Sequence, residues 1–138
     1  MSVIYNSTIR TNRLTVVNDA INSKTFAAAA GAGSAGKLVV GTSALSGATG
    51  VLAEIPLKNP AATISGDVLT IDVTGGLSGT ATATGTAAKA EIRNNAGTVI
   101  VSGLTVGLSG ADIIVNSAAI ATGQTVTVVS GTITHPST

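Results

Sequence analysis

The sequence contains no cysteine, which excludes disulfide bonds, thiolate metal sites and cysteine nucleophiles. Its aromatic residues make up only 1% of the chain and are limited to Tyr5 and Phe26. Because sugars and unpaired bases are usually bound by stacking on aromatic rings, this scarcity argues against a stacking carbohydrate-binding module and against single-stranded nucleic-acid binding. Charge is equally scarce, at 9% of 138 residues with a formal net charge of +1. The sequence therefore has no electrostatic footprint for nucleic acid or an anionic membrane.

Long hydrophobic runs are also missing. No apolar run approaches the roughly 18 residues that span a bilayer, and the N-terminus lacks the short apolar core of a signal peptide. Hydrophobic residues nevertheless make up 44% of the chain, which excludes intrinsic disorder. We therefore expect a soluble protein of one domain, with no membrane partner.

The low charge predicts that other protein covers part of the surface. A free soluble domain usually carries charge on about a quarter to a third of its surface residues. This chain has only seven basic and six acidic residues, so Thr, Ser, Gly and Ala are expected to cover most of the remaining surface. We expect a subunit that contacts copies of itself, as a dimer or trimer, or a larger protein. The alternative is a monomer coated in Thr and Ser.

Residues 1–25 are expected to form an N-terminal arm and a short amphipathic α-helix. Apolar residues at near-helical spacing predict the helix from Ile9 to Ser23, with Thr8 as its N-cap. The next segment, residues 26–36, reads FAAAAGAGSAG. Such a segment is either a flexible linker or a closely packed strand and loop, and its small side chains favour the linker.

Residues 37–138 are expected to form a mainly β domain, an antiparallel β-sandwich or a barrel-like sheet. Short segments rich in Val, Ile and Thr alternate with Gly, Asn, Asp and Ser at intervals of roughly 8 to 12 residues, which is typical of these folds. The Ser-Gly-Asp sequence at 65–67 predicts a hairpin turn. The expected strands are 37–40, 51–57, 62–64, 68–73, 80–84, 88–93, 98–102, 112–115 and 125–134, the last with a break at 130–131.

A second hairpin is predicted between residues 88 and 102. Small and apolar residues alternate with Lys89, Glu91 and Arg93, so we expect one apolar side and one charged side that faces solvent. The next four residues, NNAG, tolerate positive φ and predict the turn.

Catalytic groups are few. The single histidine, His135, lies beside Pro136 near the C-terminus, so a Ser-His-Asp arrangement would need that tail fixed over a serine. The acidic residues are isolated in sequence; two could meet across strands as a glycosidase pair, but solvation of strand ends explains them more simply. The Gly-rich TGGLSG lacks the lysine of a phosphate-binding loop. We therefore expect no enzymatic activity, no cofactor and no metal.

Several blocks of sequence occur in an order that resembles a family of small virion proteins of tailed bacteriophages. The blocks are AGKLVVGTSA, LAEIPLKNPAA, ATGTAAKAEIRNNAGTVIVSG and GADIIVNSAAIATGQTVTVVSGTITHP, and RLTVVNDAINS before them is similar to the helix that opens such proteins. The resemblance covers most of the chain and is one of pattern, without a chemically diagnostic motif. It departs from the family at Lys89–Arg93, where Ala and Glu replace large aromatic residues.

The resemblance implies a structural role in the virion, as a capsid decoration (cement) or minor capsid protein without enzymatic activity. Such a protein is made in the cytoplasm of the bacterial host, and its partner is the major capsid protein or another virion protein. The alternative is a receptor-binding or adhesive module at a tail or fibre tip.

The N-terminal arm and helix are the expected partner-binding element. Tyr5 is the best single anchor, since its ring buries a large area at low entropic cost and keeps a polar handle. In the alternative interpretation, the helix covers the open end of the sandwich. The candidate contact residues are Ile4, Tyr5, Ile9, Leu14, Val17 and Ile21.

Overall fold

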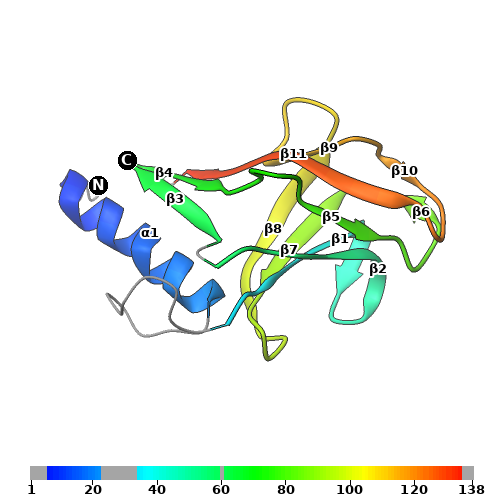
Figure 1. Cartoon of the computed structure of the whole chain (residues 1–138), viewed down its shortest axis with the longest axis horizontal. Helices are drawn as coiled ribbons and strands as arrows, with labels where there is room; N and C mark the ends of the chain where they lie inside the picture. The colour runs from blue at the N-terminus through cyan, green and yellow to red at the C-terminus, as the bar shows by residue number, and fades with distance from the viewer. Residues whose placement is uncertain (1–5, 23–33, 60, 135–138) are drawn as a thin grey trace.

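The computed structural model describes residues 6–22, 34–59 and 61–134. In these residues one helix, α1 (Ser7–Ile21), precedes eleven strands, and the predicted mainly β fold with a short N-terminal helix is confirmed (Figure 1). The strands are β1 (Lys37–Ser46), β2 (Thr49–Pro56), β3 (Ala62–Ser65), β4 (Val68–Ile71), β5 (Ser78–Thr80), β6 (Gly85–Thr86), β7 (Lys89–Arg93), β8 (Val99–Gly107), β9 (Ile113–Val115), β10 (Ala119–Ile120) and β11 (Thr125–Thr134).

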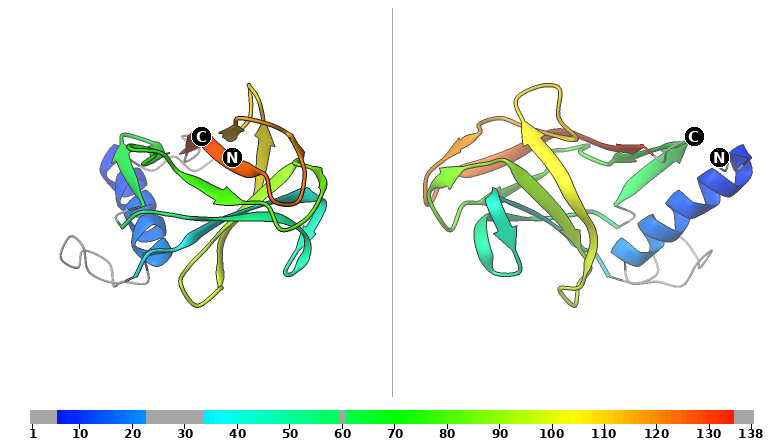
Figure 2. Two further views of the ribbon diagram at one scale, coloured as in Figure 1. Left: turned by 45° about the vertical axis from the view of Figure 1, so that its right-hand side comes forward. Right: turned by 180° about the vertical axis from the view of Figure 1, so that it is seen from behind.

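The strands pair mostly antiparallel, in the order β2-β1-β7-β8-β9-β11-β4-β3, with β5 paired to β11 beside this path. The short pair of β8 and β9 is parallel, and β6 pairs separately with β10. The sheet folds over on itself, so that β1, β2 and β7 lie in one layer and β4, β5 and β11 lie in the other (Figure 2). The ladder does not close into a barrel.

The outer edge of β2 is covered by the segment that follows β5. The backbone N–H of Thr82 donates to the carbonyl of Leu52 at 2.8 Å, and Ala53 forms an isolated bridge with Ala81. Gly79 lies against the carbonyl oxygen of Glu54 so closely that a Cβ there would collide with it. An exposed strand edge invites pairing with other chains, and here this segment protects it.

One hydrophobic core fills the space between the layers and extends to α1. Strand alternation places alternate residues in this core: Ala62 and Ile71 are buried as a cross-strand pair, whereas the next pair, Thr63 and Thr70, is exposed. The large core side chains with almost no exposure are Ile21, Leu38, Val40, Leu52, Ile55, Leu69, Ile92, Ile113, Val115 and Val126.

The helix begins two residues earlier than predicted. Asn6, and not Thr8, is the N-cap, and its side-chain oxygen accepts a hydrogen bond from the backbone N–H of Ile9 at 2.9 Å. Asn is at least as good an N-cap as Thr, so local capping explains the earlier start. The helix ends at Ile21, within two residues of the prediction.

Most of the predicted linker lies outside the described residues, but its last residues pack against the sheet. The backbone N–H of Ser34 donates to the carbonyl of Asn22 at 2.7 Å, and that of Leu57 donates to the carbonyl of Gly36 at 2.9 Å. Gly36 is buried, and a Cβ there would meet the carbonyl oxygens of Arg93 and Ile21. A glycine is therefore needed at position 36, because the backbone passes too close to Ile21 and Arg93 for a side chain to fit.

Some strand boundaries differ from the prediction because glycines lie inside strands. β1 continues past Gly41 and β8 past Gly103, at bulges or irregularities where the pairing register shifts. The break expected at 130–131 is also a register shift within one continuous strand. β5 ends where the expected strand 80–84 was to begin, and the short β6 and β10 were not predicted.

Candidate interaction surface

The expected partner-binding residues have different environments. Leu14 and Ile21 are 3% and 1% exposed and belong to the hydrophobic core, and Val17 packs against it. This corrects their expected placement at a partner: they stabilise the chain itself, as in the interpretation in which the helix covers the open end of the sandwich. Ile9 is 41% exposed, while Ile4 and Tyr5 lie outside the described residues.

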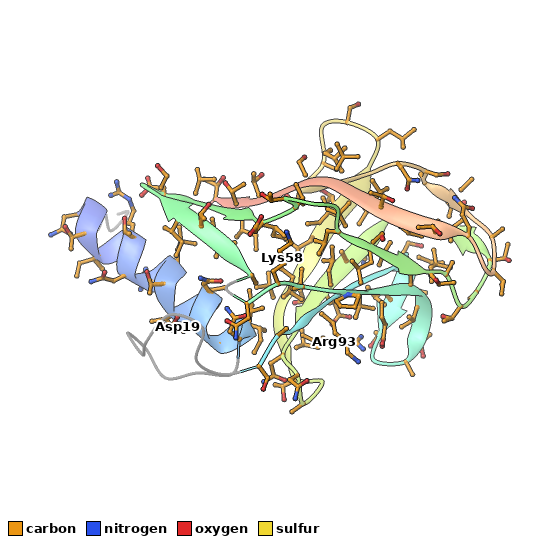
Figure 3. All side chains as sticks on the ribbon, viewed as in Figure 1. Asp19, Lys58 and Arg93 are labelled. Atoms are coloured by element: carbon orange, nitrogen blue, oxygen red, sulfur yellow. The ribbon has the colours of Figure 1, made fainter. Side chains whose placement is uncertain are left out.

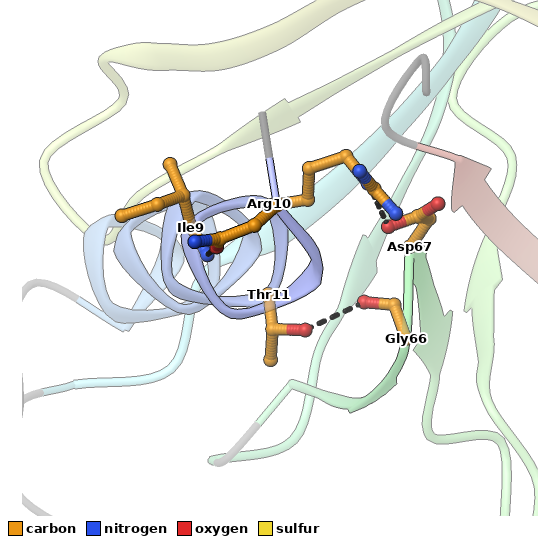
Figure 4. Close-up of polar contacts among 6 residues, drawn as sticks. Ile9, Arg10, Thr11, Gly66 and Asp67 are labelled. Carbon is orange, nitrogen blue, oxygen red and sulfur yellow. Dashed lines mark hydrogen bonds and ion pairs between the residues drawn. The ribbon is translucent and has the colours of Figure 1, made fainter. Parts of the chain in front are cut away.

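Polar contacts fix the first turns of α1 to the turn between β3 and β4 (Figure 4). The Arg10 guanidinium Nε lies 2.5 Å from Oδ1 of Asp67, and both side chains are partly buried. Beside this ion pair, the hydroxyl of Thr11 donates to the carbonyl of Gly66 at 2.9 Å. Several residues of α1 are β-branched, and such residues are poor helix formers. Tertiary contacts of this kind therefore stabilise the helix.

The helix also protects a strand edge. β3 is the last strand of the sheet, and α1 contacts β3, β4 and β8. The Asn18 side-chain amide donates to the carbonyl of Ala62 in β3 at 3.2 Å. Covering an edge with a helix is one way that proteins prevent unwanted strand pairing.

The outer side of α1 carries two exposed apolar residues. Ile9 and Val16 are 41% and 51% exposed. Val16 is seven positions after Ile9, which is about two helical turns, so the two lie on one side of the helix about 10 Å apart. They are the exposed large apolar side chains of α1.

The expected solvent-facing charges of β7 are only partly exposed. Lys89 is exposed as predicted, but Glu91 is 7% exposed, and the Arg93 side chain, 3.6 Å from the Glu91 carboxylate, is 12% exposed. The β1–β2 hairpin contributes to the burial of Arg93. Its turn approaches Arg93, whose Nη2 donates to the carbonyl of Gly47 at 2.6 Å (Figure 3). The solvent-facing side predicted for this strand was therefore wrong for Glu91 and Arg93.

Charge is divided unequally between the two layers. All charged residues within strands belong to β1, β2 and β7, whereas β3, β4, β5, β9 and β11 contain none. The charged strand residues are Lys37, Glu54, Lys89, Glu91 and Arg93.

The outward side of the uncharged strands is a surface of hydroxyl groups. Thr63, Thr70 and Thr132 are in register across β3, β4 and β11, and all three are exposed. Val129, in the middle of β11, is 56% exposed. We call this surface the uncharged face; it consists of Thr63, Thr70, Ser78, Thr80, Ile114, Thr125, Thr127, Val129, Ser130 and Thr132.

The uncharged face was not predicted as a site. A signal was available in the sequence, because Ile113 to Thr134 contains no charged residue and Thr alternates with apolar residues in TVTV and TIT. Alternation of this kind predicts an exposed side of a strand, but sequence alone does not say which strands place their exposed sides together.

Two carboxylates, those of Asp72 and Asp112, lie next to this face in the sequence, and each has partners within the chain. The Asp112 carboxylate accepts hydrogen bonds from the backbone N–H and hydroxyl of Thr105, at 3.0 and 3.2 Å. Hydrogen bonds from the backbone N–H of Thr74 and, to a smaller extent, from its hydroxyl lower the pKa of Asp72 below its ordinary value. The ammonium group of Lys58, 3.9 Å from the Asp72 carboxylate, lowers this pKa further.

Within the described ranges, no cluster of three or more metal-ligating side chains and no pocket was found. His135 lies outside these ranges. None of the described helices is long and apolar enough to cross a membrane. No family model, curated protein or solved structure matches the chain.

Proposed function

We propose that the chain is a structural virion protein that binds and stabilises the surface of a phage capsid, as a decoration or minor capsid subunit. The observation that carries the proposal is the exposed apolar outer side of α1, formed by Ile9 and Val16 on a helix that the ion pair of Arg10 and Asp67 fixes to the body. Exposed apolar side chains are weakly hydrated, so their burial against another protein is favourable.

The order of sequence blocks that resembles small virion proteins supports the same role. The blocks correspond to structural elements of one domain: KLVVGTSA lies in β1, KAEIR is β7, and TVTVVSGTIT is β11. In this role the protein acts by mass action, because a ligand that binds only the assembled shell stabilises it by the free energy of binding. Many copies arranged by symmetry multiply a modest contact per copy.

The outer side of α1 is the surface proposed to contact the shell. Ile9 and Val16 are exposed there, and the helix is fixed to the body by the ion pair of Arg10 and Asp67. A helix held in place loses little conformational entropy on binding. Deleting the helix would remove Leu14 and Ile21 from the core, so point substitutions are the appropriate test.

The test uses capsids of the phage that encodes the chain, assembled without it. Purified full-length protein is added, binding is measured by co-sedimentation, and shell stability is measured by calorimetry. We expect saturable binding and a higher melting temperature of the shell. Val16→Asp places a charge at the contact and should weaken binding by about tenfold or more.

Val99→Asp is the matched control, because Val99 is 42% exposed and belongs to β8 and not to α1. It should bind as the wild type does. Shells that neither bind the protein nor gain stability would overturn the proposal. Density for the chain at a tail or fibre tip in an electron-microscopy map would support the adhesive alternative instead.

A further inference from the structure

We propose that the uncharged face is an interface between two copies of this chain, packed face to face about a two-fold axis near Val129. This inference concerns the purified protein and does not depend on the virion role. It uses a different surface from the outer side of α1.

The lack of charge on this face limits what it can bind. The strand residues of the face carry no charge, and the bordering carboxylates of Asp72 and Asp112 are already bound within the chain. A charged side chain buried against this face would therefore find no free opposite charge, and an unpaired buried charge is costly. The complementary surface is therefore uncharged as well. The same face of a second copy meets this condition, because a two-fold axis brings identical patches together.

The hydroxyl groups of the face are also self-complementary. Each Thr or Ser hydroxyl both donates and accepts, so a hydroxyl of one copy can pair with the same group of the other. Thr63, Thr70 and Thr132 form one exposed row, and Thr80 pairs with Thr125 across β5 and β11. An apolar partner would leave these hydroxyls unpaired, at a cost that a second copy avoids.

Val129 is the apolar centre of the face. It is 56% exposed in the middle of the ten-residue strand β11, next to the register shift with β9, and the half-buried Ile114 pairs with the adjacent Ser130. Interfaces derive most of their binding energy from a few central apolar residues surrounded by polar ones. A two-fold axis near Val129 would bring the two copies of this residue together.

The size of the face indicates a weak dimer. A ten-residue strand is roughly 33 Å long, and three neighbouring strands are about 14 Å wide, so each copy contributes roughly 450 Å². The total area that the two copies would bury is below the roughly 1,200 to 2,000 Å² that stable protein–protein interfaces bury. We therefore expect a reversible monomer–dimer equilibrium, which many copies at high local concentration would strengthen.

Sedimentation velocity of the full chain, from about 10 μM to about 1 mM, tests this inference. The sedimentation coefficient of the wild type should increase with concentration. Val129→Asp should weaken dimerisation by at least about tenfold, because it places like charges against each other. Val99→Asp is the control and should behave as the wild type, since Val99 lies outside the face.

The absence of cysteine provides a second measurement. Val129→Cys introduces a single thiol, and two such thiols near a two-fold axis meet the short Cβ separation that a disulfide needs. Under mild oxidation it should form a covalent dimer at least about ten times faster than Val99→Cys, whose side chain is also exposed.

A wild-type protein that stays monomeric up to about 1 mM would overturn the inference. Dimerisation that Val129→Asp leaves unchanged would overturn it too, as would equal cross-linking at both positions. If Val129→Asp abolishes shell binding while the wild type never dimerises, the face binds the shell and the second copy is the wrong occupant. If dimerisation occurs but no shell is bound, the inference holds and the virion role fails.

Discussion

Thr105 and Asp112 form three hydrogen bonds that join the end of β8 to the start of β9. The Asp112 carboxylate accepts from the backbone N–H and hydroxyl of Thr105, and the Thr105 hydroxyl accepts from the backbone N–H of Asp112 at 3.0 Å. Parallel strands normally need a crossover of a dozen or more residues. Here the parallel pair, Val106 with Ile113 and Gly107 with Ile114, follows a short loop that these bonds close.

Replacing Thr105 with Val should therefore destabilise the chain. The substitution keeps the shape and β propensity but removes both side-chain hydrogen bonds, so we expect a loss of about 1 kcal/mol in the free energy of unfolding. Urea denaturation measures the change. Thr70→Val is the matched control at an exposed strand position and should change stability by less than about 0.5 kcal/mol. Equal effects at the two positions would show that the loop bonds do not matter.

The ion pair of Arg10 and Asp67 should stabilise the docking of α1. Because both side chains are partly exposed, at 16% and 24%, we expect Asp67→Asn to cost only about 1 kcal/mol. Amide hydrogen exchange should accelerate in α1 more than in β1 or β7.

The matched control for this pair is Glu54→Gln. Glu54 pairs with Lys37 at 3.4 Å, and both side chains are nearly half exposed. Glu54→Gln should lower the free energy of unfolding by less than about 0.5 kcal/mol. Uniform acceleration of exchange throughout the sheet after Asp67→Asn would contradict a local role for the pair.

Gly36→Ala should be strongly destabilising. A Cβ at position 36 would lie 2.5 Å from the carbonyl oxygen of Arg93 and 2.7 Å from that of Ile21, so the backbone must move. We expect a loss of about 1 to 3 kcal/mol, measured by chemical denaturation. At Gly107, by contrast, a Cβ would meet nothing closer than 3.5 Å, and Gly107→Ala should be tolerated. A mild effect at Gly36 would mean that the helix end and β7 are not held as closely as described.

Asp72 should make stability depend on pH in the acidic range. The N–H and hydroxyl of Thr74 and the charge of Lys58 lower its pKa in the folded chain. A group with a lowered folded pKa stabilises the fold above its unfolded pKa, and this contribution is lost as the pH falls through the folded value. Asp72→Asn should therefore reduce the loss of stability that occurs as the pH falls below about 4. Identical pH profiles of the two proteins would contradict this assignment.

Local signals in the sequence predicted much of the fold. The β3–β4 hairpin follows from Ser65, Gly66 and Asp67, where glycine adopts a positive φ of 59°. Segments rich in Val, Ile and Thr between turn residues predicted strands at the positions of β3, β4 and β11. These features depend on near neighbours in the chain, so the sequence contains the information directly.

Long-range packing decided the features that were predicted incorrectly. Charged residues in β7 indicate solvent exposure by themselves, but the side chains of Glu91 and Arg93 are mostly buried, and the turn of the β1–β2 hairpin contacts Arg93. Likewise, apolar residues on a terminal helix suit either a partner or a core. Contacts with β3, β4 and β8 place Leu14 and Ile21 in the core.

Composition and alternation by themselves determined that the chain is mainly β, begins with a helix and carries little charge. Those properties depend on residue type and short-range periodicity. Only the tertiary structure decided that the uncharged strands β3, β4, β5, β9 and β11 lie together while the charged strand residues gather in β1, β2 and β7. The physical reason is that strand order joins segments distant in the chain, such as β4 and β11, so the composition of each face is a property of the pairing and not of any one segment.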